Sequence, residues 1–331
     1  MTQRDNRIDS IKGFLIILVI LGHIIGTCGS GVVCEDVWQI IYLFHMPLFI
    51  LISGYLTSIK KDNKSFWQSL KRIVTPLIIF QILFVGIAVV IFRNKFSLSY
   101  LYTPYWILWY LLSLVFWRIM IQFTPKILLT KPYHYITIAT FVAIFCGLMP
   151  YGRVLSIQRT FSFFPFFLLG YYMKQGVFKT KLWSQYISYG IIVIAIALII
   201  IGLPTFLNYE NSRLMLRGAD HYTISQVPYK IYYMFLSFIV SISYFNLVPK
   251  IKLLSTLGND SMFYYLYHGL IIKFLLQPLV SYFHLPKGFI YMLVYLICIF
   301  GILFIMRHIM LFRWLVSPTL SKLNIIKNNN K

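Results

Sequence analysis

The feature that most constrains this chain is a succession of apolar stretches, each about 20 residues long, with little polar sequence between them. A helix needs a stretch of about that length to cross a bilayer. Hydrophobic residues make up 59% of the 331 residues and charged residues only 11%, whereas a soluble domain carries about 25% charged residues. Such a chain cannot cover its surface with enough polar groups for water, so we expect an all-α, polytopic membrane bundle.

Ten apolar stretches can be delimited, so we expect about ten transmembrane helices. Ten helices of about 20 residues would use about 200 residues, which leaves no stretch long enough for a separate soluble domain. We therefore expect one integral membrane domain over 1–331, with a short disordered Lys/Asn tail at 327–331. The apolar stretches fall at 10–28, 38–58, 72–92, 104–122, 134–150, 161–175, 184–203, 228–248, 260–282 and 288–312.

The distribution of basic residues predicts how these helices are oriented. If the N-terminus is cytoplasmic, 21 of the 30 Lys and Arg residues fall on the cytoplasmic side and 9 on the other. Because cytoplasmic loops carry an excess of Lys and Arg, we expect both termini in the cytoplasm. The net charge of +22 comes from residues dispersed between the apolar stretches and not gathered in one arm, so we expect no nucleic-acid partner.

The four cysteines form no metal-binding pattern, and we expect no metal site. Cys146 and Cys298 lie within apolar stretches, where cysteine behaves as a small core residue. Cys28 and Cys34 flank the short loop after the first stretch. A disulfide between them and two free thiols are both compatible with the sequence.

Ionisable residues inside apolar stretches cost free energy to insert and usually mark a pathway or a site. In the first stretch, eleven residues separate Lys12 from His23, which places them within about 20° of each other around a helix and roughly 16 Å apart along it. Asp9 lies about 60° from Lys12 on the same side. A cation would thus stand at the cytoplasmic mouth of a channel with an imidazole deep in the bilayer. Alternatively, Lys12 anchors the helix and His23 bonds to a neighbouring carbonyl.

The second stretch carries a histidine at a comparable depth. His45 and His23 on adjacent helices could form a base or a proton relay, because a neutral imidazole accepts a proton near pH 7. Ser53 and Gly54 follow in the same stretch. They could line a site, or they could be a small-residue contact between helices.

Further candidates lie near the ends of other apolar stretches. Lys71 and Arg72 begin the third stretch at the inner face, where they could hold a phosphate or anchor the helix. Trp109 could be a residue of the aromatic belt at the interface. Arg159 is placed at an outer mouth, and His268 is a third histidine within an apolar stretch.

These residues stand in six short motifs that follow one another along most of the chain. The motifs are Asp9-Ser10-Ile11-Lys12-Gly13 with Leu21-Gly22-His23, Phe44-His45-Met46-Pro47-Leu48-Phe49 with Ser53-Gly54-Tyr55, Lys71-Arg72-Ile73, Trp109-Tyr110-Leu111, Phe164–Tyr172, and Leu257–Ser261 with Tyr265–His268. In this order they resemble the membrane O-acyltransferases of acyltransferase family 3, most closely the fucose 4-O-acetylase-like branch. Many members carry Arg where this chain has Lys12, and Lys would bind phosphate as a point charge, without the bidentate fork of Arg.

The resemblance implies transfer of an acyl group, usually acetyl, from cytoplasmic acyl-CoA to a hydroxyl of a carbohydrate, without a tightly bound cofactor. The expected acceptor is a cell-surface polysaccharide or its lipid-linked precursor, and the expected location is a bacterial cell membrane, among its lipids. We expect His23 and His45 to be catalytic. The expected acyl-CoA-binding residues are Lys12, Asp9, Arg72 and Lys71, and the expected acceptor-binding residues are Trp109, Arg159, His268 and Ser53.

A different class of function also fits a polar, aromatic-lined channel through a membrane. An exporter or flippase of a polysaccharide or lipid-linked sugar would need such a channel without transferring any acyl group. It would have no need of a deep His23 aligned with Lys12 at the cytoplasmic mouth. This alignment favours the acyltransferase.

Overall fold

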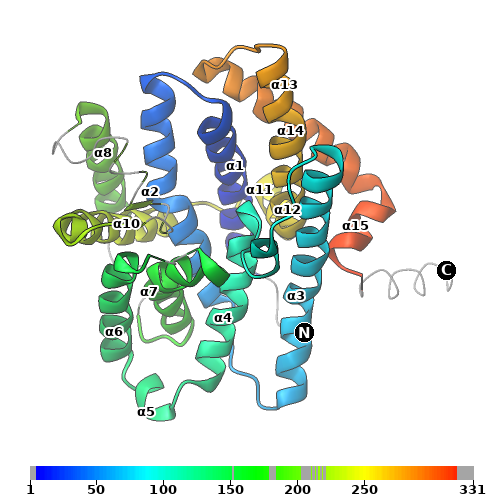
Figure 1. Cartoon of the computed structure of the whole chain (residues 1–331). Coiled ribbons are helices and arrows are strands. Elements are labelled where there is room, and N and C mark those ends of the chain that lie inside the picture. Colours follow the sequence, from blue (N-terminus) through cyan, green and yellow to red (C-terminus); the bar gives the residue numbers. More distant parts are fainter. Residues whose placement is uncertain are drawn as a thin grey trace.

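The fold is a bundle of helices (Figure 1). Among the residues that the structure describes there is no strand, so the expected all-α polytopic bundle is confirmed. The expected disordered tail at 327–331 lies outside the described residues. This computed structural model describes residues 5–150, 153–178, 184–202, 210, 213, 215, 216, 218 and 221–318.

Each of the ten expected apolar stretches coincides with one helix or with two or three consecutive helices. Six helices of the described chain are long and apolar enough to cross a membrane: α1 (Asn6–Cys28), α2 (Val32–Tyr55), α3 with η1 (Asn63–Ile91), η3 with α4 (Trp106–Phe123), η6 with α10 (Ile224–Leu247) and α14 (Phe289–His308). The other four stretches correspond to α6 with η4 (Pro132–Leu148), α7 (Ile157–Lys174), α8 (Gln185–Ile201), and the series α12 (Ser261–Ile271), η7 (Ile272–Leu276) and α13 (Gln277–Tyr282). Short helices complete the fold: η2 (Leu98–Leu101), α5 (Lys126–Leu129), η5 (Val154–Ser156), α11 (Lys252–Asn259) and α15 (Met310–Val316).

The first two helices form the centre of the bundle. Figure 1 shows α8 and α10 on the side of α2, and α12 and α14 on the side of α1. Helices at the periphery expose apolar side chains: on α14, Ile290 is 74% exposed and Ile297 is 71% exposed. Such a surface suits contact with lipid tails, whereas most residues of α1 and α2 are buried against their neighbours.

Two helices begin at aspartate caps. The Asp5 carboxylate accepts a hydrogen bond from the backbone N–H of Arg7 at 2.8 Å, and the Asp62 carboxylate accepts one from Ser65 at 2.7 Å. These caps satisfy donors that the first turn of α1 and of α3 cannot pair internally. The hydrogen bond from Ser65 lowers the pKa of the Asp62 carboxyl below its usual value, because it stabilises the charged form.

Helices α2 and α7 cross in backbone contact at a pair of glycines. A Cβ added to Gly54 would lie 1.9 Å from the carbonyl oxygen of Phe167, and one added to Gly170 would lie 1.8 Å from that of Leu51. Neither position can accommodate a side chain unless the helices separate. The small-residue contact foreseen for Gly54 is therefore present, and it fixes α7 against the helix that carries His45.

A second glycine pair joins α1 to α11. A Cβ on Gly13 would lie 1.9 Å from the carbonyl oxygen of Leu254, and a Cβ on Gly258 would lie 1.8 Å from that of Asp9. Because the two backbones touch, the Asp9 side chain is buried at the start of α1. The start of the helix that carries Lys12 and His23 is thus held in place by α11.

Candidate active site

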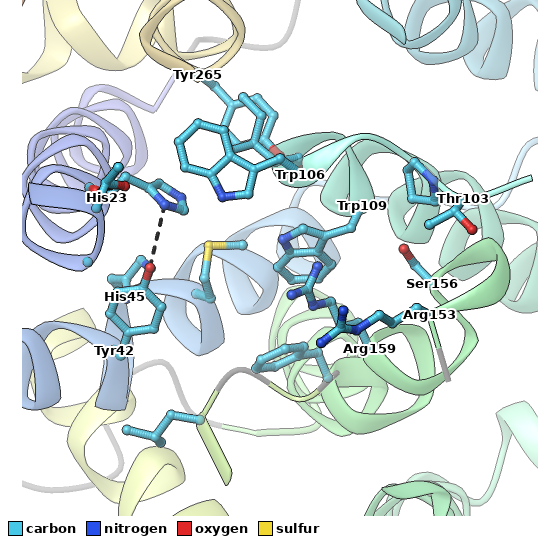
Figure 2. A pocket seen from close by; sticks show the side chains of 17 residues that line it. His23, Tyr42, His45, Thr103, Trp106, Trp109, Arg153, Ser156, Arg159 and Tyr265 are labelled. Carbon is cyan, nitrogen blue, oxygen red and sulfur yellow. Dashed lines mark hydrogen bonds between the residues drawn. The ribbon is translucent and has the colours of Figure 1, made fainter. Parts of the chain in front are cut away.

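One cavity of about 380 Å³ opens among the central helices. It is lined by residues from α1, α2, the segment leading into α4, the start of α7, and α12 (Figure 2). It lies near the end of α1 and the start of α2, which is the side predicted to face outward. Its volume is at the low end of the about 300–1,000 Å³ typical of small-molecule sites.

His23 lines this cavity from the last third of α1. Three aromatic rings surround its half-buried imidazole, with centroid distances of 5.0 Å to Trp106, 5.4 Å to His268 and 6.3 Å to Tyr42. The Tyr42 hydroxyl lies 3.5 Å from Nδ1 of His23 (Figure 2), which is the upper limit for a hydrogen bond. The imidazole is thus held by rings while one edge stays open to the cavity.

His45 lines the same cavity from α2. It is buried, and its Nδ1 donates a hydrogen bond to the Ile41 carbonyl at 2.7 Å. Since a carbonyl can only accept, a neutral His45 carries its hydrogen on Nδ1 and leaves Nε2 as an acceptor. The Tyr42 ring lies 4.6 Å from the His45 ring, so Tyr42 stands between the two histidines.

Sequence reasoning missed Tyr42, although one signal was available. Tyr42 precedes His45 by three residues, and residues three apart on a helix share one face. Its ring also stacks on Trp38 with centroids 3.8 Å apart. Recognising its role required knowing that this face of α2 meets α1 at His23.

His268 lies against His23 and not on the acceptor side of the cavity. It is fully buried on α12 and does not line the cavity. Its Nδ1 donates to the Tyr264 carbonyl at 3.0 Å, and its Nε2 has no hydrogen-bond partner in the described part of the chain. This geometry suits a residue that supports the His23 ring more than one that touches a sugar.

Trp109 and Arg159 line the cavity together. The Arg159 guanidinium lies over the Trp109 ring, 4.9 Å from its centroid, as in a cation–π contact. Arg153 lines the cavity as well, and sequence reasoning did not single it out. The available signal was its place in the same predicted outer loop, six residues before Arg159.

The cavity rim contains backbone in an unusual conformation. Trp106 has a φ of 40°, and the consecutive residues Leu155 and Ser156 have φ of 49° and 55°. Positive φ costs free energy for residues other than glycine, and it is often kept where function requires it. These residues belong to two rim segments, one at 102–106 and one at 153–156. A hydrogen bond joins the segments, because the Leu155 N–H donates to the Tyr102 carbonyl at 2.9 Å.

Ser53 does not line the cavity. Its hydroxyl lies 2.6 Å from the Tyr110 hydroxyl and donates to the Phe49 carbonyl at 2.8 Å. The Tyr110 ring packs 5.4 Å from the ring of Tyr265, which does line the cavity. Ser53 is thus connected to the cavity through two tyrosines, Tyr110 and Tyr265, on the side toward the predicted cytoplasmic face.

The expected acyl-CoA-binding residues are only partly brought together. Lys12 Nζ lies 2.7 Å from the Asp9 carboxylate, in a pair whose side chains are 16% and 5% exposed. Lys71 and Arg72 are both exposed on α3, which packs on α4, η3 and α15. The structure therefore pairs Asp9 with Lys12 and leaves the other two cations on a separate helix at the same predicted face.

Cys28 and Cys34 are both free and buried in the structure. The Cys34 thiol lies 3.9 Å from the Lys287 carbonyl, at the limit for a sulfur hydrogen bond. Among the described residues, no group of three or more His, Cys, Asp or Glu could hold a metal ion.

Comparison with known proteins places this geometry in context. The acyltransferase domain family matches residues 5–308. Nodulation protein NolL of Sinorhizobium fredii is 32% identical over 194 residues, which are 53% of this chain and 50% of that protein. Nodulation protein NolL of Mesorhizobium japonicum is 44% identical over 72 residues, which are 20% of this chain and 19% of that protein. The chain thus matches about half of the first relative's length and about a fifth of the second's, and no solved structure matches it significantly.

Proposed function

The chain belongs to the acyltransferase domain family that matches residues 5–308, and from this membership we propose that it transfers an acetyl group from acetyl-CoA to a carbohydrate hydroxyl. The observation that carries the proposal is His23, an imidazole that lines a cavity among the central helices. An ionisable group at that depth needs a reason. Removing a proton from an acceptor hydroxyl is the reason that best fits an acyltransferase.

In the proposed reaction, His23 acts as the general base. It takes the proton of the acceptor hydroxyl while the oxygen attacks the thioester carbonyl carbon. A C–O bond forms, the C–S bond breaks, and the proton passes from His23 to the departing CoA sulfur. Alternatively, His23 attacks the thioester carbon, the C–S bond breaks and the CoA thiolate departs. In a second step the hydroxyl oxygen attacks the acetyl carbon, the bond to His23 breaks, and the proton of the hydroxyl goes to the CoA thiolate.

Two further histidines support this role in the proposal. His45 assists proton transfer through its Nε2, because its Nδ1 is occupied by the Ile41 carbonyl. His268 holds the His23 ring in position from behind, at a centroid distance of 5.4 Å. Tyr42 lies between His23 and His45 and orients both rings.

The donor would approach from the cytoplasmic end of α1. Lys12, already paired with Asp9, would bind a CoA phosphate through a charge-assisted hydrogen bond, and Lys71 and Arg72 would add cations at the same face. The rise of roughly 16 Å from Lys12 to His23 is comparable to the length of the pantetheine arm. The acceptor, a surface polysaccharide or a lipid-linked sugar of a bacterial cell membrane, would occupy the cavity beside Trp109 and Arg159.

The test compares the surface polysaccharide of cells carrying the intact gene, its deletion, His23→Ala or His23→Gln. Proton NMR counts the O-acetyl groups per repeat unit. We expect loss of acetyl groups with unchanged polymer yield in all three altered strains, since Gln keeps polar contacts but cannot take the proton. His134→Ala serves as the matched control, because His134 is exposed on α6 and should leave acetylation intact.

The opposite result would identify the rival function. If the deletion strain kept acetylated polymer but retained it inside the cell, the protein would be an exporter. If His23→Gln kept near-normal acetylation in membranes containing equal amounts of protein, His23 would not be the base.

A further inference from the structure

Gln81 is a polar residue in an otherwise apolar part of α3. It carries the only polar side chain between Leu77 and Ile91, and it is half-buried. A polar side chain within a membrane helix costs free energy to insert, so it usually has a hydrogen-bonding partner or a function. Gln81 does not line the cavity, and any influence that it has on the site must pass through the residues that it contacts.

The side-chain amide of Gln81 holds the backbone of residues 100–105, which lead into the rim of the cavity. Its Nε2 donates hydrogen bonds to the carbonyls of Tyr100 at 2.8 Å and Thr103 at 3.2 Å. Its Oε1 accepts one from the N–H of Tyr105 at 2.8 Å. Carbonyls only accept and an N–H only donates, so these contacts fix the orientation of the amide. Both ends of the Gln81 amide therefore fasten this loop to α3.

Helix α3 holds the same loop by a second contact. The Tyr105 ring stacks on the ring of Phe84, with centroids 5.2 Å apart. Phe84 follows Gln81 by three residues, so both side chains lie on one side of the helix, and Phe84 is fully buried. The backbone and the side chain of Tyr105 are therefore both fixed, and so is the point from which Trp106 continues the chain.

Trp106, the next residue, has a strained backbone and lies beside His23. Its φ is 40°, a conformation that costs free energy for a residue with a side chain and persists where the surrounding contacts impose it. Its ring lines the cavity, and its centroid lies 5.0 Å from that of the His23 ring (Figure 2). A negative φ at Trp106 would rotate its side chain about the N–Cα bond and carry the indole away from His23.

We propose that Gln81 is a positioning residue, which holds residues 100–105 so that the Trp106 ring stays against His23. This inference rests on the proposed function and adds to its site a residue that does not line the cavity. The hydrogen bonds of Gln81 oppose relaxation of the strained Trp106 backbone. Without them the indole would leave the wall of the cavity, the space beside His23 would widen, and the imidazole would lose one of the rings that hold it.

The consequence for the reaction is a loss of alignment. The proposed transfer needs the acceptor hydroxyl, the thioester carbon and a His23 nitrogen in one geometry, and a displacement of about 1 Å can lower such a rate about 100-fold. In the proposed reaction the donor approaches from the other end of α1, so its binding does not involve Trp106. A change at Gln81 should therefore lower kcat/KM for the acceptor and leave KM for acetyl-CoA unchanged.

The first measurement is hydrogen exchange by mass spectrometry on the full-length protein in nanodiscs, without substrate. Gln81→Met keeps the length of the side chain and removes the amide, so the amides of 100–106, Tyr105 foremost, should exchange about tenfold faster or more. Gln81→Glu has the same shape, but its carboxylate cannot donate to two carbonyls, so it should accelerate exchange as well. Gln68→Met is the matched control, because Gln68 is exposed near the start of α3 and should leave exchange at 100–106 unchanged.

The second measurement follows the Trp106 ring itself. The protein contains seven tryptophans, and in protein labelled with 5-fluorotryptophan the fluorine NMR signal of Trp106 is assigned with Trp106→Phe. In an otherwise wild-type protein, His23→Ala should shift this signal, because the two rings are adjacent. In Gln81→Met the Trp106 signal should move, and adding His23→Ala should then shift it far less. Neither of these two measurements requires transfer of an acyl group.

Kinetics test the same link through the reaction. The donor is labelled acetyl-CoA, and a membrane fraction of the deletion strain is the source of polymer and lipid-linked precursor. At limiting acceptor, Gln81→Met should lower the transfer rate about tenfold or more, with KM for acetyl-CoA unchanged. If Gln81 acts through Trp106, the double variant of Gln81→Met with Trp106→Ala should be no slower than Trp106→Ala alone.

Each measurement has a result that would overturn the inference. These results are exchange at 100–106 that is the same in Gln81→Met as in the wild type, a Trp106 signal that stays in place, and rate losses that add in the double variant. A Gln81→Glu protein that matches the wild type in exchange would overturn it too, because the shape of the side chain would then suffice without its hydrogen bonds.

The inference and the proposed function fail in different ways. If the wild type transfers no acetyl group while exchange and the Trp106 signal respond as expected, the proposed acetyl transfer falls and the anchoring of Trp106 by Gln81 stands. If Gln81→Met transfers acetyl groups at the wild-type rate and its exchange is unchanged, the proposed function stands and the inference is overturned.

Discussion

At the scale of single residues, the ring of His23 is surrounded by neighbours that come from three other elements. Tyr42, Trp106 and His268 approach its ring from α2, η3 and α12. The sequence placed His23 and His45 at comparable depth, and both line the cavity. Helix geometry can predict the depth of each histidine, because that depth depends only on the spacing of residues within one helix. The position of His268 behind His23 depends on how α12 packs on α1, and no spacing within either segment encodes that.

One prediction tests His268 as a positioning residue. The buried ring contacts His23 without lining the cavity, so His268→Gln should lower kcat by about tenfold or more and leave KM for acetyl-CoA unchanged. Steady-state kinetics on purified protein measure both constants. A purely structural role would instead lower the thermal midpoint and the yield while the kcat of the folded fraction stayed the same.

At the scale of helices, the apolar stretches predicted which segments are helical, because a span needs length and hydrophobicity more than any particular residue. The ends were less predictable. Helix α2 begins at Val32, six residues before the expected stretch, and the ninth stretch is interrupted by the π-turn η7. Ser53 shows the same limit: its spacing within α2 was evident, but its bond to Tyr110 depends on how α4 packs.

The crossing of α2 and α7 gives a prediction of stability. Gly170→Ala would put a Cβ 1.8 Å from the Leu51 carbonyl oxygen, so the helices must move apart, at a cost of about 1–3 kcal/mol. Thermal unfolding in detergent should show a lower midpoint. Gly190→Ala on α8 is the control, because nothing lies within 4 Å of its Cβ position. There, Ala should be neutral or slightly stabilising, and equal losses in the two variants would contradict the backbone-contact interpretation.

The cap of α3 gives a prediction of pH dependence. The pKa of Asp62 is lowered by the hydrogen bond from Ser65, so the cap contributes stability above the unfolded-state pKa of about 3.9 and loses it as pH falls through the lower folded-state value. Near neutral pH, Asp62→Ala should speed hydrogen exchange of the first amides of α3. Mass spectrometry should show that the exchange rates of the wild type and of Asp62→Ala converge as the pH falls through that range. A constant difference between the two rates would argue against stabilisation by the Asp62 carboxylate.

At the scale of the whole molecule, the bundle places its cavity near one face and the Lys12–Asp9 pair near the other. The excess of basic residues predicted which face is cytoplasmic, since that rule depends only on counts in loops. The presence of Arg153 and Arg159 in one cavity could not be predicted in the same way. Both residues were counted among the outer cations, but their convergence on one cavity follows from the turn before α7.

This orientation is itself testable with reporter fusions. Green fluorescent protein fused to the C-terminus should fluoresce, because both termini are predicted to be cytoplasmic. Alkaline phosphatase inserted after Lys287, in the predicted outer connection between α13 and α14, should be active. A non-fluorescent C-terminal fusion together with an inactive phosphatase would show that the topology is the reverse of the predicted one. The cavity would then open to the cytoplasm.

The glycine pairs at Gly54–Gly170 and Gly13–Gly258 divide the site into a fixed part and an adjustable part. Helices whose backbones touch cannot slide past each other without a clash, so α7 keeps its position on α2, and α11 keeps its position on α1, whatever acceptor is present. The rim segments, joined through the Leu155–Tyr102 hydrogen bond, carry no such constraint. Substitutions there should change which acceptor is admitted while the histidines remain in place, so a laboratory search for new acceptor specificity should begin at the rim.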